Sequence, residues 1–312
     1  MDIVYRKLSS RNKICFILIG ILLISSILVT IIYIRNHRKK YSTSPLDIDF
    51  YGDYSDTHVL TTRICCFILT APKYFLTRAK AINDTWASRC DRYFFVSEYA
   101  IDMMTSEELN FTQHIPIAPL KELNAGYTHL TQKSTLSFIH AYENYLNDYE
   151  WFVKADDDTY LVVENLKAFL SEQNASEPIT FGYNFKILVS KGYHSGGAAY
   201  VLSREAVRRF YEAHHNPNSK CRKDGGAEDV EIAKCLRREG VYPGKSLDDH
   251  NRELFHPLSF TDHFYGSLPN WLEKNAENPL KVYYDCCGDQ TISFHYIPPE
   301  GQYLLDFLIY SS

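Results

Sequence analysis

An unbroken run of 21 uncharged residues, Ile14 to Ile34, sets the first limit on how this chain can fold. A helix of that length matches the hydrocarbon thickness of a bilayer. The run is longer than the apolar part of a typical signal peptide and has no evident small-residue cleavage site, which favours an uncleaved anchor. The predicted organisation is a tail over residues 1–13, a transmembrane helix over 14–34, a short polar stem over 35–60 and one folded domain over 61–312.

Cysteines and glycosylation motifs orient this anchor. Basic residues flank the run on both sides, so the positive-inside rule does not decide its direction. Seven of the eight cysteines follow it, together with three N-glycosylation sequons at Asn83, Asn110 and Asn174. Cysteine at this density in a large globular portion is typical of an oxidising lumen. We therefore expect a single-pass type II membrane protein with a lumenal domain.

The charge distribution supports that division and excludes one class of partner. The chain has 33 Lys and Arg against 38 Asp and Glu, but eight of the basic residues and a single acidic one lie in the first 40 residues, which leaves the rest with a net charge of −12. An acidic domain does not attract nucleic acid. It can still bind an anionic nucleotide when a metal supplies the positive charge.

Strand-like and helix-like segments alternate from residue 63 onward. Short apolar runs predict strands, and apolar residues at helical spacing predict helices. Strands are expected over Ile64–Leu69, Tyr93–Val96 and Trp151–Val153, and helices over Leu76–Trp86, Thr128–Leu146, Val162–Leu170 and from the segment 225–231 to Gly240. This repetition predicts an α/β domain with a mostly parallel sheet, in which ligands bind at the carboxyl ends of the strands.

Asp156, Asp157 and Asp158 follow directly on the third predicted strand. Adjacent carboxylates repel one another, and a buried carboxylate is costly unless it is paired or bound to a cation. In an extended chain Asp156 and Asp158 project to one side and Asp157 to the other, which forms a clip for a divalent cation with open positions for nucleotide phosphates. The alternative is an acidic turn that caps the helix beginning near Val162.

Two further segments combine glycine with residues that can do chemistry. The pair Gly196-Gly197 either lets the backbone approach a ligand closely or serves as a flexible turn before a strand. Farther on, Gly225–Glu231 opens a helix and puts Glu228 and Asp229 in its first turn. The helix dipole favours ionised carboxylates there, so this pair either caps the helix or supplies a general base.

His295 stands in the apolar segment Ser293–Tyr296. A lone histidine in an apolar strand is usually a core residue. Opposite a carboxylate triplet, however, it would complete a mixed oxygen and nitrogen site that suits Mn²⁺.

The cysteines lack the spacing of a zinc site and predict disulfides instead. Cys221 and Cys235 flank the Glu-Asp segment, so a bridge between them would hold the start of its helix in place. An odd number of lumenal cysteines leaves one unpaired. The open pairings are Cys90 with Cys65 or Cys66, and Cys286 with its neighbour Cys287 or with another cysteine.

Taken in order, several segments resemble the β1,3-glycosyltransferase superfamily that includes fringe, and within it the core 1 β1,3-galactosyltransferases. The resemblance covers nearly all of the lumenal part. The segments that carry it are Lys80–Cys90, Trp151–Tyr160, Gly192–Ser203, Glu228-Asp229, Phe255–Pro257, Cys286-Cys287 and Ser293–Tyr296. The chain departs from the pattern at Gln132, where relatives typically carry Trp, at His194, where they carry Met, and over Tyr265–Tyr284, which is poorer in aromatic residues.

The resemblance implies a GT-A fold, Rossmann-like with a mostly parallel sheet flanked by helices, in a Golgi type II membrane protein. It also implies a donor, UDP-galactose, a cofactor, Mn²⁺, and a homodimer such as relatives suggest. The reaction would move galactose to O3 of α-GalNAc on Ser or Thr of glycoproteins, in a single displacement that inverts the linkage. This product is the core 1 O-glycan.

The resemblance also assigns site residues. The metal would be held by Asp156, Asp158 and His295. The catalytic pair Glu228-Asp229 would supply the base, for which Asp229 is favoured over Glu228. The donor would be bound by Lys133, Asp156, Asp157, Tyr193, Ser195, Gly196 and Gly197, and the acceptor by Trp271, Tyr283 and Tyr284.

Two other functions are compatible with the same segments. One is a fringe-like β1,3-transfer with another donor or acceptor. The other is a catalytically silent lumenal chaperone of the same family, a class that lacks the acidic triplet. Because this chain keeps the triplet, the Glu-Asp pair and His295, its sequence favours an enzyme.

Overall fold

The computed structural model describes residues 61–98 and 104–310 of the 312-residue chain. The predicted tail, anchor and stem lie outside these ranges. Within them, no helix combines the length and the apolar character that crossing a membrane requires. The chain divides into two units, Met1–Asp49 and Phe50–Ser312, and the described residues all belong to the second.

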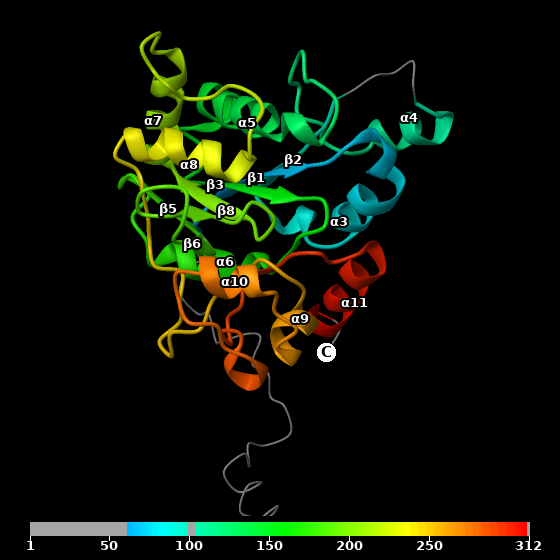
Figure 1. Cartoon of the computed structure of the whole chain (residues 1–312). Coiled ribbons are helices and arrows are strands. Elements are labelled where there is room, and N and C mark those ends of the chain that lie inside the picture. Colours follow the sequence, from blue (N-terminus) through cyan, green and yellow to red (C-terminus); the bar gives the residue numbers. More distant parts are fainter. Residues whose placement is uncertain (1–60, 99–103, 311–312) are drawn as a thin grey trace, which may run out of the picture. The chain divides into compact units, whose positions relative to one another are not determined.

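A six-stranded sheet in the order β2-β1-β3-β8-β5-β9 forms the centre of this unit (Figure 1). Its strands are β1 (Ile64–Leu69), β2 (Arg92–Val96), β3 (Trp151–Asp156), β5 (Ile179–Gly182), β8 (Tyr200–Ser203) and β9 (Tyr242–Pro243). Strand β8 runs antiparallel to both of its neighbours, while the other pairings are parallel. The predicted α/β domain with a mostly parallel sheet is therefore confirmed, with β8 reversed.

Strand β1 shows why the sheet is covered on both faces. All six of its residues are buried, because successive side chains point to opposite faces and both faces carry apolar layers. Cys65, Phe67 and Leu69 belong to one core with Phe138 and Phe210, and Ile64, Cys66 and Ile68 belong to the other. The helices that cover the first face are α5 (Leu130–Tyr145), α7 (Arg204–His215) and α8 (Glu228–Arg238), which lie together above the sheet in Figure 1.

Shorter elements lie on the opposite side of the sheet, with α6 (Val163–Ser171). One small sheet has the order β10-β11-β4, and β6 pairs with β7 in another. Their bounds are β4 (Tyr160–Leu161), β6 (Asn184–Phe185), β7 (Tyr193–His194), β10 (Phe255–His256) and β11 (Ser293–Phe294). The short helices are α9 (Phe260–Tyr265), α10 (Asn270–Asn275) and η6 (Tyr283–Asp285), followed by the longer α11 (Pro299–Tyr310).

The predicted helix over Leu76–Trp86 is wrong in its bounds. The chain forms a short π-helix, η2 (Phe75–Ala79), and then a short α-helix, α3 (Lys80–Asp84). Thr85 ends the helix with a non-helical backbone and turns its hydroxyl back to the carbonyl of Ala81 at 2.7 Å. The remaining helices are η1 (Pro72–Tyr74), η3 (Ala87–Arg89), α4 (Ser106–Thr112) and η5 (Tyr127–His129).

Three disulfides join the described cysteines, in the pairs Cys66–Cys90, Cys221–Cys235 and Cys286–Cys287. Cys65 is the described cysteine that stays free, and it is buried. The alternation along β1 explains the choice between the two neighbours, because Cys66 shares one core with Cys90 whereas Cys65 faces the other. The predicted pairing of Cys221 with Cys235 is confirmed, but it fastens the loop before α8 to the second half of that helix rather than to its start.

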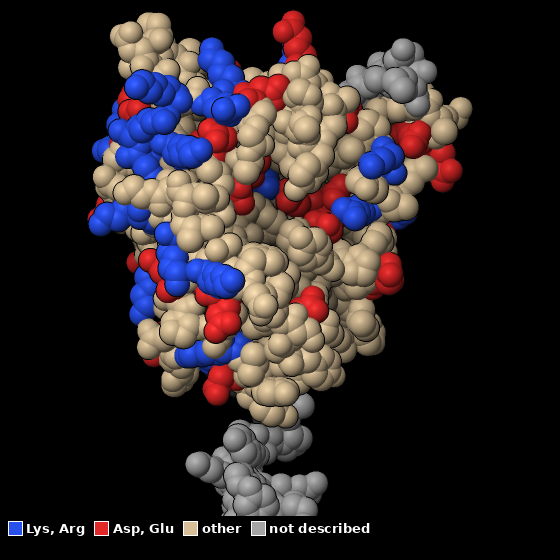
Figure 2. Space-filling model, in the orientation of Figure 1, with Lys and Arg blue, Asp and Glu red and all other residues tan. Residues whose placement is uncertain are grey.

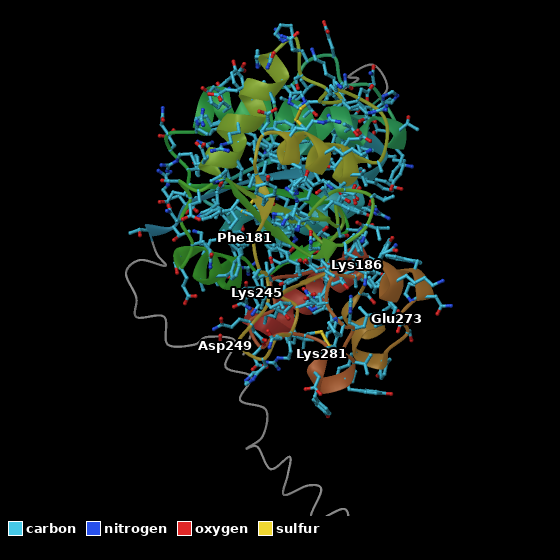
Figure 3. The ribbon with its side chains drawn as sticks, turned by 60° about the vertical axis from the view of Figure 1, so that its left-hand side comes forward. Phe181, Lys186, Lys245, Asp249, Glu273 and Lys281 are labelled. Carbon is cyan, nitrogen blue, oxygen red and sulfur yellow. A yellow bond between two sulfur atoms is a disulfide. The ribbon has the colours of Figure 1, made fainter. Side chains whose placement is uncertain are left out.

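Side chains as well as backbone groups hold the loops of the segment from residue 244 to residue 285 together. Lys281 donates to the carbonyls of His250 and Asn251 at 2.9 Å, and Lys245 donates to the Asn251 side chain at 3.1 Å. Figure 3 shows Lys245 and Asp249 on one loop beside the stretch that carries Lys281. The one strand of this segment is β10, which pairs with β11 of the later chain, and its helices are short.

Candidate functional site

The acidic triplet lies at the carboxyl end of β3, where ligands of such sheets bind. It is not extended beyond Asp156, since the amide of Thr159 donates to the Asp156 carbonyl at 3.2 Å and closes a turn over Asp157 and Asp158. The predicted alternation along an extended chain is therefore wrong. The capping alternative is also wrong, because α6 begins at Val163 with no side chain capping it.

The turn nevertheless brings two of the three carboxylates together with a histidine. Ligand atoms of Asp156, Asp158 and His295 all lie within 4.8 Å of one another, and all three residues are half-buried. This is the metal set that the sequence predicted. Two carboxylates and an imidazole suit a divalent cation such as Mn²⁺, so the residues fit the implied cofactor. Among the described residues a second cluster, at His214, contains the bridged Cys221 and Cys235, whose sulfurs are already bonded to each other.

The orientation of His295 fits the same role. Its Nδ1 lies 3.2 Å from the carbonyl oxygen of Pro257, which can only accept, so this nitrogen carries a proton. Its Nε2 lies 3.2 Å from Asp158 Oδ1. A protonated ring donates from this nitrogen to the carboxylate, whereas a neutral ring presents a lone pair to a cation held between the two atoms. The His295 ring also stacks on Tyr296 at 3.8 Å, so it is not a core histidine.

Gly197 makes room for this ring. A Cβ atom built on Gly197 would overlap the imidazole of His295, so any side chain here would displace the histidine. At Gly196 a Cβ would lie 2.9 Å from Glu228 Oε2 and 3.2 Å from Lys154 Nζ. Close approach, rather than a flexible turn, therefore explains the double glycine.

Asp157 is not one of the clustered ligands and has partners of its own. It accepts from the Thr70 hydroxyl at 2.7 Å and from Arg78 at 3.0 Å. Burial raises the pKa of Asp157 to about 6, although these two hydrogen bonds oppose the shift. The Thr70 carbonyl in turn accepts from Lys133 at 2.8 Å, and Lys133 pairs with Glu98. Thus the predicted donor residues Lys133 and Asp157 meet at the end of β1.

Asp158 is held in its ionised form by three cations or donors. Burial alone would raise its pKa, but the hydrogen bond to His295 and the charges of His295, Arg78 and Lys154 outweigh burial and lower the pKa below its usual value. Arg78 bridges Asp157 and Asp158 from a single nitrogen, at 3.0 and 3.1 Å. Its guanidinium lies over the ring of Tyr74, 4.4 Å from the ring centre.

Glu228 and Asp229 begin α8 but have different surroundings. The Glu228 carboxylate is 7% exposed and accepts from the hydroxyls of Ser134 at 2.5 Å and Tyr200 at 2.7 Å. Asp229 accepts from the amides of Gly196 at 3.3 Å and of its own neighbour Val230 at 2.8 Å. No side chain caps the helix at Ala227, although both residues lie in its first turn. Burial, and then the charge of Glu228, raise the pKa of Asp229 to about 6.

Lys154 connects the two groups of carboxylates. Its Nζ lies 2.7 Å from Asp156 Oδ1, 3.2 Å from the Gly196 carbonyl and 3.4 Å from Glu228 Oε2. Burial would lower the pKa of this ammonium, but the carboxylates of Asp156 and Glu228 outweigh burial and raise the pKa above its ordinary value. The lysine therefore stays charged inside the protein and joins the predicted metal site to Glu228, the neighbour of the predicted base Asp229.

The other predicted donor residues lie on the neighbouring loop. Ser195 is buried, and its amide donates to the Tyr183 carbonyl at 2.9 Å. Tyr193 on β7 is buried beside Asp229. Burial and the charge of that carboxylate raise the pKa of Tyr193 to about 12. Both residues thus adjoin the Gly196-Gly197 pair.

The predicted acceptor residues are exposed and reach the site through other aromatic rings. Trp271 on α10 is 46% exposed and contacts Phe185 at 6.0 Å, and Phe185 contacts Tyr193 at 5.3 Å. The rings of Tyr283 and Tyr284, 55% and 78% exposed, both pack on Phe264. Phe264 leads through Phe260 to Phe294, the residue before His295. The three predicted acceptor residues therefore form two groups, Trp271 beside Phe185 and the two tyrosines beside Phe264.

Sequence reasoning did not single out Thr70, Arg78, Ser134, Lys154 or Tyr200. One of them had a readable signal: Lys154 stands inside an apolar strand, two residues before Asp156 and so on the same face. A lysine in such a position requires a buried carboxylate partner. The others come from distant segments, and their contacts with the triplet or with Glu228 depend on the folded chain.

Acidic and basic side chains gather on different parts of the surface. In Figure 2, acidic side chains lie in a hollow near the middle of the visible face, where the carboxyl ends of β1 and β3 point in Figure 1. Lys and Arg gather instead on the left, over α7 and α8. A hollow rich in carboxylates attracts a cation before it attracts an anion.

Comparison with known proteins places this site in a family. The sequence profile of the Fringe-like family matches residues 61–259, which is more than half of the chain. The chain belongs to the Fringe-like family. The matched stretch contains the triplet and the Glu228-Asp229 pair and ends before His295, so the histidine rests on the geometry above. The resemblance to the superfamily that includes fringe is confirmed.

Curated relatives agree with this placement. The Fringe-like chain is 38% identical over 252 residues to glycoprotein-N-acetylgalactosamine 3-beta-galactosyltransferase 1 of Xenopus laevis, covering 80% of this chain and 66% of the frog protein. It is 30% identical over 189 residues to human chondroitin sulfate synthase 3, covering 55% of this chain and 20% of that one. It is 25% identical over 221 residues to mouse beta-1,3-glucosyltransferase, covering 69% and 41%. The chain thus spans about two thirds of the first relative and a fifth of the second.

Solved structures include distant glycosyltransferases. One, involved in glycosylation of the major capsid of PBCV-1, is 14% identical with a TM-score of 0.32 and coverages of 51% of this chain and 68% of that chain. Another, the galactosyltransferase LgtC, is 11% identical with a TM-score of 0.37 and coverages of 74% and 86%.

Proposed function

We propose that this Fringe-like protein is an inverting β1,3-galactosyltransferase that moves galactose from UDP-galactose to O3 of α-GalNAc on Ser or Thr of glycoproteins. The observation that carries the proposal is the convergence of Asp156, Asp158 and His295 on one side of Lys154 and of Glu228, the neighbour of Asp229, on the other. The 38% identity to the frog enzyme supports galactose as the sugar and GalNAc as the acceptor. A GT-A arrangement of the sheet belongs to the same proposal.

On this proposal Asp156, Asp158 and His295 hold a divalent cation, Mn²⁺. When bound, the cation neutralises charge on the diphosphate leaving group as a Lewis acid. Lys133, Asp157 and the loop of Tyr193, Ser195, Gly196 and Gly197 shape the donor site. Asp157, which is turned toward Thr70 and Arg78, supports this end of the sheet rather than the cation.

The same geometry favours Asp229 over Glu228 as the base. Both oxygens of Glu228 are engaged, by Ser134 and Tyr200 on one side and by Lys154 on the other, so this carboxylate fixes the helix start. The pKa of Asp229, raised to about 6 by burial and by Glu228, suits proton removal near neutral pH. Asp229 takes the proton of the acceptor hydroxyl. The oxygen of that hydroxyl bonds to the anomeric carbon of the donor as the bond from this carbon to UDP breaks.

Localisation follows from the sequence and completes the proposal. The protein would be anchored in the Golgi membrane by residues 14–34 as a type II protein, with homodimerisation as in relatives and acceptor sugars meeting Trp271, Tyr283 and Tyr284.

One assay tests the function directly. The full-length chain is incubated with Mn²⁺, UDP-galactose and a peptide that carries α-GalNAc, and the product linkage is determined. We expect a β1,3-linked galactose, and no transfer when the metal is chelated. Parallel reactions with fucosyl and xylosyl acceptors and with UDP-GlcNAc test the fringe-like alternative. Transfer to those acceptors alone would overturn the core 1 assignment.

A binding experiment tests the metal assignment separately. Asp158→Ala removes a carboxylate that sits 3.2 Å from His295, and it should abolish metal-dependent UDP binding measured by calorimetry. Unchanged binding would show that the cation is held elsewhere. Asp285→Ala, which removes a carboxylate from the short helix η6 and so lies outside the cluster, serves as the control.

A further inference from the structure

Lys154 is an unusual residue for its position. It lies in the middle of β3, a central strand whose first five residues are buried, and its side chain is 1% exposed. An apolar side chain of similar length would fill this space without the loss of hydration that a buried charge entails. A buried lysine at such a position is therefore expected to do something that an apolar residue does not.

The three contacts of its ammonium come from three different parts of the site. One is Asp156, the last residue of its own strand. Another is the carbonyl of Gly196, on the loop that precedes β8. The third is Glu228, at the start of α8. Two of these contacts are hydrogen bonds and the third is an ion pair, and together they fix three segments relative to one point.

We propose that Lys154 is a positioning residue, whose buried ammonium holds the carboxylate of Asp229 in place relative to the donor side of the site. The inference rests on the proposed function. Lys154 does not contact Asp229 directly in the described structure but holds both groups that adjoin it. Glu228 precedes Asp229 in the helix, and Gly196, whose carbonyl accepts from Lys154, donates its amide to Asp229 at 3.3 Å.

The charge of Lys154 acts on Asp229 as well. The groups that surround Asp229 are Glu228, Lys154, Tyr193, Tyr200, His194 and Arg237. The negative charge of Glu228 raises the pKa of Asp229 and the positive charge of Lys154 lowers it. Loss of the ammonium would therefore change the position of the Asp229 carboxylate and raise its pKa.

The experiment compares two variants of the full-length enzyme. Lys154→Met keeps the length of the side chain but removes the charge and all three N–H groups, and Lys154→Arg keeps the charge in a planar group that cannot reach the same three acceptors. We expect both to lower kcat roughly 10- to 100-fold at saturating donor and acceptor, the effect of a base displaced by about 1 Å. In Lys154→Met the acid limb of the kcat/KM profile should also shift to higher pH.

A matched control separates positioning from loss of stability. Lys167 on α6 pairs with Asp91 at 2.8 Å, and Asp91 also accepts from the amide of Ile64 at the opposite end of β1. Lys167→Met should lower the melting temperature without changing kcat or the pH profile. A double-mutant cycle adds a second measure: if Lys154 acts through Glu228, the losses in Lys154→Met and Glu228→Gln will multiply to more than the loss in the double variant.

The outcomes distinguish this inference from the proposed function. Wild-type protein that transfers galactose, together with a folded Lys154→Met variant of unchanged kcat and pH profile, would overturn the positioning role alone. If Lys154→Met does not fold, Lys154→Arg decides: a wild-type kcat overturns the role, and a reduced kcat with unchanged UDP affinity supports it. If the wild-type protein transfers no galactose but transfers another sugar, and the Lys154 variants lower kcat for that sugar without changing UDP affinity, the positioning role is supported and only the galactosyl assignment is overturned.

Discussion

The donor side and the acceptor side of the site are built in different ways. On the donor side, Asp156 and Asp158 follow a central strand, and each is engaged by a buried or half-buried partner such as Lys154 or His295. On the acceptor side, Trp271 and Tyr284 project from short helices, with 46% and 78% of their surface exposed, and contact mainly other rings.

This difference indicates which properties can vary independently. A carboxylate held by several hydrogen bonds loses its geometry when any partner changes, because each remaining buried group is left unsatisfied. An exposed ring on a short helix can be exchanged with little effect on the rest of the molecule. We expect substitutions on the donor side to remove activity and substitutions on the acceptor side to change which acceptors are used.

The largest expected effect comes from the carboxylate that separates the two sides. Asp229→Asn keeps the size of the side chain but cannot accept the acceptor's proton, and kcat should fall about 10²- to 10⁴-fold. UDP affinity should stay within about twofold, because the amide still fits beside Gly196. Steady-state kinetics and calorimetry measure the two quantities.

Asp224→Asn is the matched control for that variant. Asp224 lies on the loop before α8 and pairs with His129 at 2.7 Å, outside the carboxylate network. It should retain kcat near the wild-type value. If Asp229→Asn keeps more than about a tenth of the activity, the base lies elsewhere and Glu228 becomes the first candidate.

Gly197→Ala tests the donor side through a single methyl group. Because this methyl would overlap the imidazole of His295, the ring must leave its present position beside Asp158. We expect the affinity for Mn²⁺ in the presence of UDP to weaken roughly 10- to 100-fold, the usual cost of misplacing a metal ligand.

The control for this variant is Gly244→Ala, where an added methyl would likewise overlap an aromatic ring, that of Phe181, but outside the metal set. It should leave metal affinity unchanged. A Gly197→Ala variant with wild-type metal affinity would remove His295 from the ligand set.

Much of the donor side was predictable because it depends on local pattern. The apolar run Ile64–Leu69 matched its strand residue for residue, and the triplet lay at a strand end as its position in the sequence indicated. The grouping of Asp156 with Asp158 was predicted for a wrong reason, since a turn rather than an extended chain brings them together. The choice of Cys66 over Cys65 depended on which face of β1 meets Cys90, and the alternation of a strand does not reveal that.

The acceptor side was less predictable for a physical reason. Between residues 244 and 285 the helices have six residues or fewer, too short for a hydrophobic period to identify them, and loops hold one another by contacts such as that of Lys281 with the His250 carbonyl. The contacts of Lys154 with Gly196 and Glu228 likewise join residues far apart in sequence. Their partners are set by the fold and not by spacing.

The pH dependence of kcat/KM tests Asp229, the carboxylate between the donor side and the acceptor side. Asp229 acts as a base only when it is ionised, and burial together with Glu228 raises its pKa to about 6. Activity should therefore be full well above pH 6 and fall as the pH drops through 6, about tenfold per pH unit below it in kcat/KM. Glu228→Gln removes the neighbouring negative charge and should move this midpoint to lower pH. A midpoint that stays in place in that variant would indicate that another group controls the acid limb.

The smallest expected effect is on the acceptor side, in Trp271→Ala. Stacking of a sugar ring on an exposed indole adds about 0.5–1.5 kcal/mol, so KM for the GalNAc-peptide should rise roughly 2- to 12-fold while kcat and UDP affinity stay nearly constant. Phe307→Ala on α11 removes another exposed aromatic ring, 63% exposed, and should change none of these values. If Trp271→Ala lowers kcat as strongly as Lys154→Met is expected to, the indole acts on the reacting groups through Phe185 and Tyr193, and the two sides are one coupled network. If neither KM nor kcat changes, the acceptor sugar meets the Tyr283 and Tyr284 face instead, and the same measurement on Tyr284→Ala would then show the rise in KM.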